Sequence, residues 1–88
     1  MKIKSGFILK DLVGKTCVVA VGERSKEFKG MVFLNETGKF IWKVLESGAT
    51  KDEIVDKLLN EYEGATREEI EADVNTFIEN LAKDNILE

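Results

Sequence analysis

The chain has 88 residues, of which 43% are hydrophobic and 34% are charged, and it contains no proline. This composition is typical of one globular domain, spanning residues 1–88, and not of a disordered segment. The longest apolar runs, residues 17–21 and 31–34, are far shorter than the roughly 20 residues that a membrane-spanning helix requires, so we expect no membrane segment.

The absence of histidine and the presence of one cysteine narrow the chemistry that we expect. Histidine is the commonest general acid or base and the commonest metal ligand, and a single cysteine forms neither a pair of zinc ligands nor an internal disulfide. We therefore expect no catalytic residue, no metal site and no bound cofactor. The N-terminus lacks an apolar stretch of signal-peptide length, which together with the lone Cys17 predicts a cytoplasmic protein.

The first third of the chain has the pattern of three β-strands. Residues 7–12 and 16–21 are apolar and β-branched runs, and the intervening Val13, Gly14 and Lys15 are typical of a hairpin turn. Polar residues end the second run at 22–27. Residues 28–34 then predict a third strand, with a bulge or a close approach at Gly30. The three strands are expected to form an antiparallel meander.

From Asn35 onward the apolar residues follow the period of helices, in three segments. Asn35 is placed to cap the first helix and Gly48 to end it. The segments 50–53 and 66–69 have the capping-box pattern at the starts of the second and third helices, and Gly64 ends the second. Trp42 lies off the first apolar stripe, and we expect it to pack at the base of the sheet. The expected stripes are Phe40, Ile41, Val44 and Leu45; Ile54, Val55, Leu58, Leu59 and Tyr62; and Ile70, Val74, Phe77, Ile78 and Leu81.

Three strands followed by three helices, with Ile86 and Leu87 folding back onto the core, define an α+β class. The arrangement predicts a winged helix-turn-helix-like fold with a three-stranded antiparallel sheet. Such a fold raises the hypothesis of nucleic-acid binding through the third helix. That helix, residues 67–84, has two cations against six anions, so it repels phosphates and we expect no nucleic-acid partner.

The third strand of a meander lies at the edge of the sheet, and here it carries four consecutive apolar residues, Met31 to Leu34. If Val32 and Leu34 face the helices, Met31 and Phe33 face the other way and need a cover. An extended peptide added as a further strand is one explanation. Cover by the third helix or by a second copy of the chain is the other, and the residues alone do not choose between them.

Several of these segments, in this order and at this spacing, resemble the PqqD family. They are residues 6–10, the hairpin at 13–21, residues 30–38, and Phe40-Ile41-Trp42 before Leu45 and Gly48. The most specific is Leu34-Asn35-Glu36-Thr37-Gly38 followed by an apolar residue and Trp42. The Asp73-Val74 pair with Phe77 and Leu81 also matches. The likeness covers almost the whole chain.

The resemblance implies a non-catalytic peptide chaperone. The PqqD family is named for a protein of coenzyme PQQ (pyrroloquinoline quinone) biosynthesis, and its fold is the recognition element of pathways that modify ribosomally made peptides. Members bind the leader of a precursor peptide as an extra strand and deliver it to a radical S-adenosylmethionine (radical SAM) maturase. Carried over by position, the groove here consists of Phe28, Lys29, Met31, Val32 and Phe33 from the strand, and of Glu71, Val74, Asn75, Ile78 and Ala82 from the third helix.

Two other classes of function stay open from the residues alone. One is a winged-helix module that binds nucleic acid, and the other is a structural dimerisation module that pairs its own third strand across a two-fold axis. The expected state is a monomer or a homodimer. The identity of the precursor peptide and of the modifying enzyme does not follow from the sequence.

Overall fold

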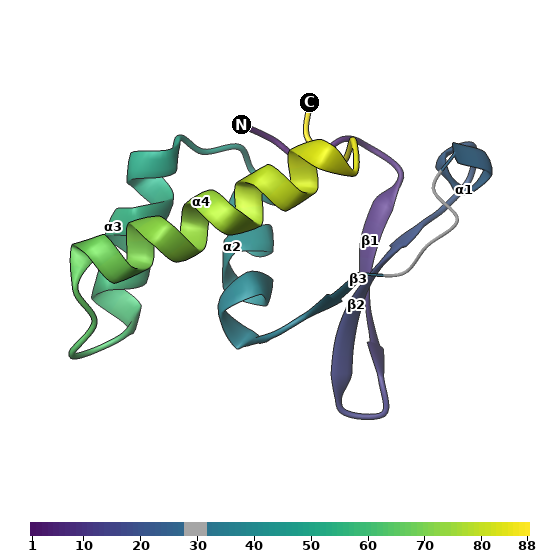
Figure 1. The fold of residues 1–88 in the computed structure, drawn as a ribbon. Helices are drawn as coiled ribbons and strands as arrows, with labels where there is room; N and C mark the ends of the chain where they lie inside the picture. The colour runs from purple at the N-terminus through teal and green to yellow at the C-terminus, as the bar shows by residue number, and fades with distance from the viewer. Residues whose placement is uncertain (28–31) are drawn as a thin grey trace.

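The computed structural model describes residues 1–27 and 32–88, and it confirms the α+β class (Figure 1). One short helix adds to the expected elements, in the polar segment after the second strand. It is a single turn, in which the hydroxyl of Ser25 donates to the carbonyl of Gly22 at 2.6 Å, and one turn is too short to show an apolar period. The elements are β1 (Phe7–Leu12), β2 (Lys15–Ala20), α1 (Arg24–Glu27), β3 (Val32–Leu34), α2 (Glu36–Glu46), α3 (Lys51–Glu61) and α4 (Arg67–Lys83).

The three strands form one antiparallel sheet in the order β1-β2-β3, which confirms the predicted meander. The hairpin between β1 and β2 has two turn residues, Val13 and Gly14, which both have positive φ, at 46° and 79°. Such a turn has the twist of a two-residue hairpin, but a β-branched residue rarely adopts positive φ. β2 begins and ends one residue earlier than expected. The predicted third strand is described only from Val32, because residues 28–31 lie outside the described part of the chain.

Residues directly opposite each other on paired strands point to the same face of the sheet. The face that packs against the helices, here called the covered face, carries Phe7, Leu9, Val18, Ala20, Val32 and Leu34. The opposite face, here called the open face, carries Ile8, Lys10, Leu12, Lys15, Cys17, Val19 and Phe33. Phe33 is 58% exposed, so its expected orientation away from the helices is confirmed. Met31, which was expected beside it, lies outside the described residues.

The predicted helix caps form where the sequence places them. The side chain of Asn35 accepts from the N–H of Gly38 at 2.7 Å, and Gly48 follows α2 with a φ of 87° that only glycine adopts readily. Thr50 and Glu53 form the capping box of α3. The second capping box is half formed. The hydroxyl of Thr66 accepts from the backbone N–H of Glu69, but the Glu69 carboxylate accepts from the Thr66 hydroxyl and not from the Thr66 backbone N–H. No described helix has the length and apolar character needed to cross a membrane.

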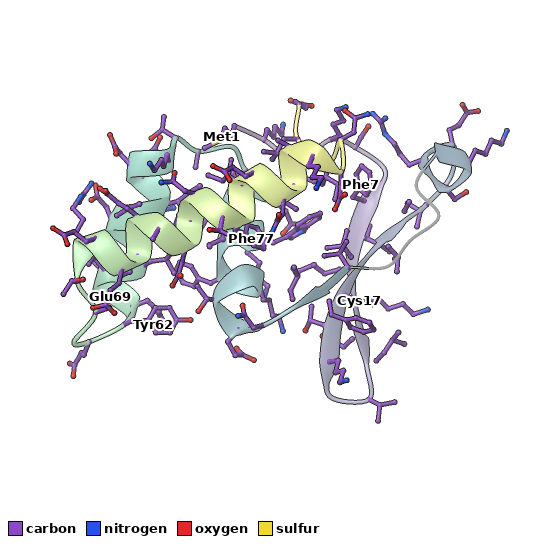
Figure 2. All side chains as sticks on the ribbon, in the orientation of Figure 1. Met1, Phe7, Cys17, Tyr62, Glu69 and Phe77 are labelled. Carbon is purple, nitrogen blue, oxygen red and sulfur yellow. The ribbon has the colours of Figure 1, made fainter. Side chains whose placement is uncertain are left out.

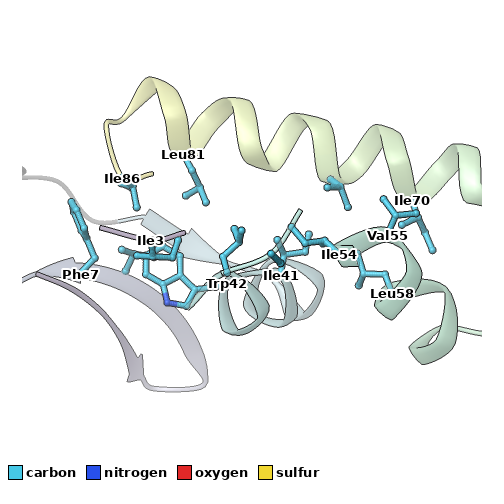
Figure 3. Close-up of a cluster of buried hydrophobic side chains, with 14 residues drawn as sticks. Ile3, Phe7, Ile41, Trp42, Ile54, Val55, Leu58, Ile70, Leu81 and Ile86 are labelled. Atoms are coloured by element: carbon cyan, nitrogen blue, oxygen red, sulfur yellow. The ribbon is translucent and has the colours of Figure 1, made fainter. Parts of the chain in front are cut away.

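The core lies between the covered face and the helices α2, α3 and α4, with Trp42 at its centre (Figure 3). Trp42 is fully buried, which confirms the expected packing, and among the described residues its indole N–H finds no hydrogen-bond acceptor. Ile86 is also fully buried, and Leu87 pairs with Ile3, so the C-terminus folds back as predicted. Tyr62 differs from expectation: α3 ends at Glu61, and Tyr62 is exposed because its backbone is already extended.

We expect Val13→Asn to stabilise the protein, because asparagine tolerates positive φ far better than a β-branched residue. A gain of about 1 kcal/mol in the free energy of unfolding is the expected size. The measurement is urea unfolding followed by the fluorescence of Trp42, the single tryptophan. Val21→Asn makes the same chemical change at an exposed site with ordinary φ and should give no gain; equal gains in both variants would contradict the strain at Val13.

The capping box predicts a pH dependence of stability. The N–H of Thr50 donates to the Glu53 carboxylate at 3.1 Å, and this contact lowers the pKa of Glu53 below its ordinary value. A carboxyl with a lowered folded-state pKa stabilises the fold above its unfolded-state pKa, and the contribution is lost as the pH falls through the folded-state pKa. We therefore expect Glu53→Gln, which keeps the hydrogen bond, to lose less stability than the parent between about pH 5 and pH 3.

The measurement for this prediction is the free energy of unfolding of each protein across that pH range. Glu61→Gln, on the same helix, is the matched control and should follow the parent. Parallel losses in the parent and in Glu53→Gln would show that the capping box carries none of the pH dependence.

Candidate functional site

The hydrogen-bond pattern of the sheet identifies which backbone groups of β3 face its free edge. Leu12 and Lys15 flank the two-residue turn, so they form a hydrogen-bonded pair, and bonded and non-bonded pairs then alternate along the ladder. It follows that the backbone N–H and C=O of Cys17 form hydrogen bonds with β1, whereas those of its neighbours Thr16 and Val18 point toward β3.

On β3 the partners of Thr16 and Val18 are Leu34 and Val32. Phe33 lies opposite Cys17 in a non-bonded pair, so its own N–H and C=O point away from β2, toward the free edge. Among the described residues of β3, Phe33 is therefore the one that offers both a donor and an acceptor to a further strand. Its ring lies on the open face, where the ammonium of Lys15 is 5.6 Å from the ring centroid.

A hollow of about 270 Å³ lies where the end of β3 meets α2 and α4. We call it the α4 hollow. Its floor is apolar, with the buried Ile41 and the half-buried Phe77, and its rim is polar. Figure 2 shows Phe77 on the side of α4 that faces α2. The lining residues are Asn35, Thr37, Gly38, Ile41, Asp73, Thr76, Phe77 and Asn80.

Gly38 permits the close approach of α4 to the start of α2. A Cβ at this position would lie 3.0 Å from Cε2 of Phe77 and 3.2 Å from Oδ1 of Asn35. Both distances are shorter than ordinary carbon contacts, and the same Asn35 oxygen caps α2. The lack of a side chain at Gly38 therefore leaves room for Phe77 beside the α4 hollow, and it also leaves the Asn35 cap of α2 undisturbed.

A second hollow, of about 460 Å³, lies on the other side of the end of β3. It shares Asn35 with the α4 hollow and extends to the β1–β2 turn at Gly14. The remaining lining residues are Lys15, Thr16, Phe33, Leu34 and Glu36. A strand along the free edge of β3 would thus find a concave surface on each side of Asn35.

The strand half of the expected groove is placed only in part. Phe33 is exposed on the open face, and Val32 is half-buried against the core on the covered face. Phe28, Lys29 and Met31 lie outside the described residues, so their expected role stays a prediction.

The helix half of the expected groove lies on a different flank of α4 from the α4 hollow. Glu71 accepts from Arg67 at 3.0 Å, and Arg67 also donates to Asp56 of α3 at 2.9 Å, so the N-terminal end of this flank lies next to α3. Val74 is 0% exposed and belongs to the core, and Ile78 is half-buried against it. Asn75 and Ala82 are exposed. The structure does not bring these five residues into the α4 hollow.

The α4 residues of the hollow were not among the predicted binding residues. Asp73, Thr76, Phe77 and Asn80 follow the i, i+3, i+4, i+7 spacing of one helical face, next to the buried stripe. Part of the signal was present in the sequence, because Asp73 and Phe77 and the segment 34–38 carry the family resemblance. Of these, Asn35, Thr37, Gly38, Asp73 and Phe77 line the α4 hollow, whereas Leu34 and Glu36 line the second hollow.

Within residues 1–27 and 32–88, no group of three or more His, Cys, Asp or Glu side chains is arranged to hold a metal ion. Cys17 is a free thiol that points to the open face of the sheet, and it is nevertheless fully buried. Its sulfur lies 3.4 Å from the carbonyl oxygen of Lys10.

An antiparallel sheet with an open third strand, backed by three helices, defines a winged-helix-like α+β domain. The sequence profile of the family described as coenzyme PQQ synthesis protein D (PqqD) matches residues 8–87, and the chain belongs to this family. No protein with a curated description matches the chain.

A solved structure described as TbiB1 in complex with the TbiA(beta) leader peptide is similar to this chain along its whole length. The two are 27% identical, with a TM-score of 0.78, and the match covers 100% of this chain and 95% of TbiB1.

We expect Gly38→Ala to lower the free energy of unfolding by about 1 kcal/mol, although the same change in an open helix usually stabilises by a similar amount. The added Cβ would press on Phe77 and Asn35. Unfolding followed by Trp42 fluorescence measures the change. Phe77→Leu should offset the loss in the double variant, because it removes the ring atom nearest to position 38. A stabilised Gly38→Ala variant would show that Phe77 does not pack tightly there.

Proposed function

We propose that this chain binds the leader segment of a ribosomally made precursor peptide as an additional strand on β3, and presents it to a modifying enzyme. The observation that carries the proposal is the match of the entire chain to a domain whose solved structure contains a leader peptide. Membership of the PqqD family supports the same function.

The free edge of β3 supports strand addition as the mode of binding. A peptide laid along this edge would exchange two main-chain hydrogen bonds with Phe33, which recognise extended backbone regardless of sequence. Specificity would come from side chains that enter the hollows beside the edge. The apolar floor of the α4 hollow, formed by Ile41 and Phe77, suits an apolar leader residue, and its polar rim suits the adjacent backbone.

The proposed partner enzyme is a radical SAM maturase, as the family resemblance implies. The iron–sulfur chemistry would belong to that enzyme, and this chain would hold the substrate without catalysis. The buried position of Cys17 agrees with a structural role for the one cysteine.

A second copy of the chain is the competing occupant of the β3 edge. Two copies related by a two-fold axis would pair β3 with β3 through the same groups of Phe33. Light scattering of the purified protein distinguishes the two occupants. Pairing of β3 between two copies raises the mass, and a peptide that binds the same edge would displace the second copy and lower the mass again.

The test is a titration of ¹⁵N-labelled protein with the leader segment of a short peptide encoded beside this gene, against a scrambled peptide of equal composition. We expect amide shifts along the edge strand at residues 32–34, and in the α4 hollow at Asn35, Thr37, Gly38, Asp73, Thr76, Phe77 and Asn80. Shifts centred on Glu71, Asn75 and Ala82 would support the flank predicted from the family instead. A spectrum unchanged by the leader, from a protein that is monomeric, would contradict the proposed function.

Phe33→Pro tests the role of the backbone at the edge. Proline removes the N–H that faces the free edge and spares the bonds between β2 and β3, so the sheet should form. We expect the affinity for the leader to fall by about tenfold or more, as for the loss of one well-formed hydrogen bond. Phe33→Leu keeps the N–H and is the matched control. Equal affinities of the proline and leucine variants, both folded, would contradict strand addition at Phe33.

A further inference from the structure

We propose that the open face of the sheet is a docking surface for the enzyme that modifies the bound peptide, and that it takes an apolar surface edged by carboxylates. This inference rests on the proposed function and adds a second interface to it. The leader would occupy the edge of β3, and the enzyme would contact the face of the sheet that the helices leave uncovered.

The apolar side chains of the open face support docking. Ile8 is 46% exposed and Phe33 is 58% exposed, at opposite edges of the sheet, and the half-buried Val19 and the buried Cys17 lie between them on β2. Adjacent strands lie about 4.8 Å apart, so these residues form one continuous band across three strands. None of these four residues belongs to the core cluster that packs between the sheet and the helices α2, α3 and α4. A band of this kind on a small domain is typical of a protein interface.

The charge of the open face indicates which kind of surface would bind it. On the described strands this face carries two lysines, Lys10 and Lys15, and no carboxylate. Asp11, the single acidic residue of the strands, points to the covered face, where Lys39 of α2 lies 4.0 Å from its carboxylate. An apolar band with cations beside it is complementary to an apolar surface rimmed by Asp or Glu.

A second copy of the chain fits this face less well. Two open faces related by a two-fold axis would bring lysines together, which disfavours the pairing. The acidic residues of the chain lie mostly in 35–88, where fourteen Asp and Glu stand against six Lys and Arg. A head-to-tail contact of that part with the open face of another copy would generate a ring or an open chain of copies.

The open face is continuous with the edge that the leader would occupy. A strand paired beside Phe33 places the residue opposite it on the same face of the sheet. The bound leader would thus extend the apolar band by its own side chains. The enzyme would then contact the carrier and part of its cargo together, so the leader-loaded domain should bind the enzyme more tightly than the free domain.

The test uses substitutions on β1, which lies two strands away from the β3 edge. Lys10→Glu reverses an exposed charge of the open face, and Ile8→Asp interrupts the apolar band. Lys57→Glu makes the same charge change on an exposed site of α3 and is the matched control. Trp42 fluorescence and circular dichroism confirm that each variant is folded. The probe is the peptide-modifying enzyme encoded beside this gene, immobilised for biolayer interferometry, with the free and the leader-loaded domain in solution.

We expect Lys10→Glu and Ile8→Asp each to weaken enzyme binding by about tenfold, with Lys57→Glu within about twofold of the parent. Added salt should weaken binding of the parent more than binding of Lys10→Glu. Leader affinity, measured separately by amide shifts, should be the same in all four proteins.

Equal enzyme binding by Lys10→Glu, Ile8→Asp and the parent would overturn the proposal, and so would a parent that does not bind the enzyme at all. A parent dimer that Lys10→Glu dissociates would assign the open face to a second copy and would also overturn it. If the parent fails to bind leader but the variants still lose enzyme binding, the docking surface stands and the proposed function at β3 falls.

Discussion

The alternation of side chains along three short strands divides this small sheet into two unlike faces, and the other features depend on that division. Three helices follow the sheet, and they pack on one face only, around Trp42. On the opposite face Ile8 and Phe33 stay exposed, and among the described strands β3 pairs on one side only. The open face and the free edge of β3 are therefore the two surfaces that we propose for contacts with other molecules.

The same arrangement places a concave surface at the end of the exposed strand. β3 passes directly into α2 through the cap residue Asn35, and α4 crosses the start of α2 where Gly38 has no side chain. The α4 hollow is thus bounded by a strand end, a helix N-terminus and a helix flank. The hollow itself supplies a polar rim and an apolar floor at Ile41 and Phe77. The unpaired backbone of Phe33 lies on the strand that leads to it. This combination suits an extended peptide better than a small rigid ligand.

Much of the fold could be predicted because its signals are local. Asn35, Thr50 and Thr66 cap helices by reaching backbone groups three residues away, so the starting points of α2, α3 and α4 do not depend on distant contacts. The limits of β1 and the outward orientation of Phe33 follow from period-two patterning. The single turn of α1 and the exposure of Tyr62 escaped prediction, because one helical turn has no period and a helix end is set by its surroundings.

The candidate site shows where local reasoning ends. The sequence by itself determined that the third strand has an apolar edge, that an acidic helix follows, and that the order and spacing of motifs are those of the PqqD family. Only the tertiary structure decided which flank of α4 meets the start of α2. Burial of Val74 and the contact of Arg67 with Asp56 set the rotation of α4 about its axis, and this rotation turns Glu71 toward α3 and Phe77 toward Gly38. A helical period defines the faces of a helix, but the neighbours that pack against them assign each face its place.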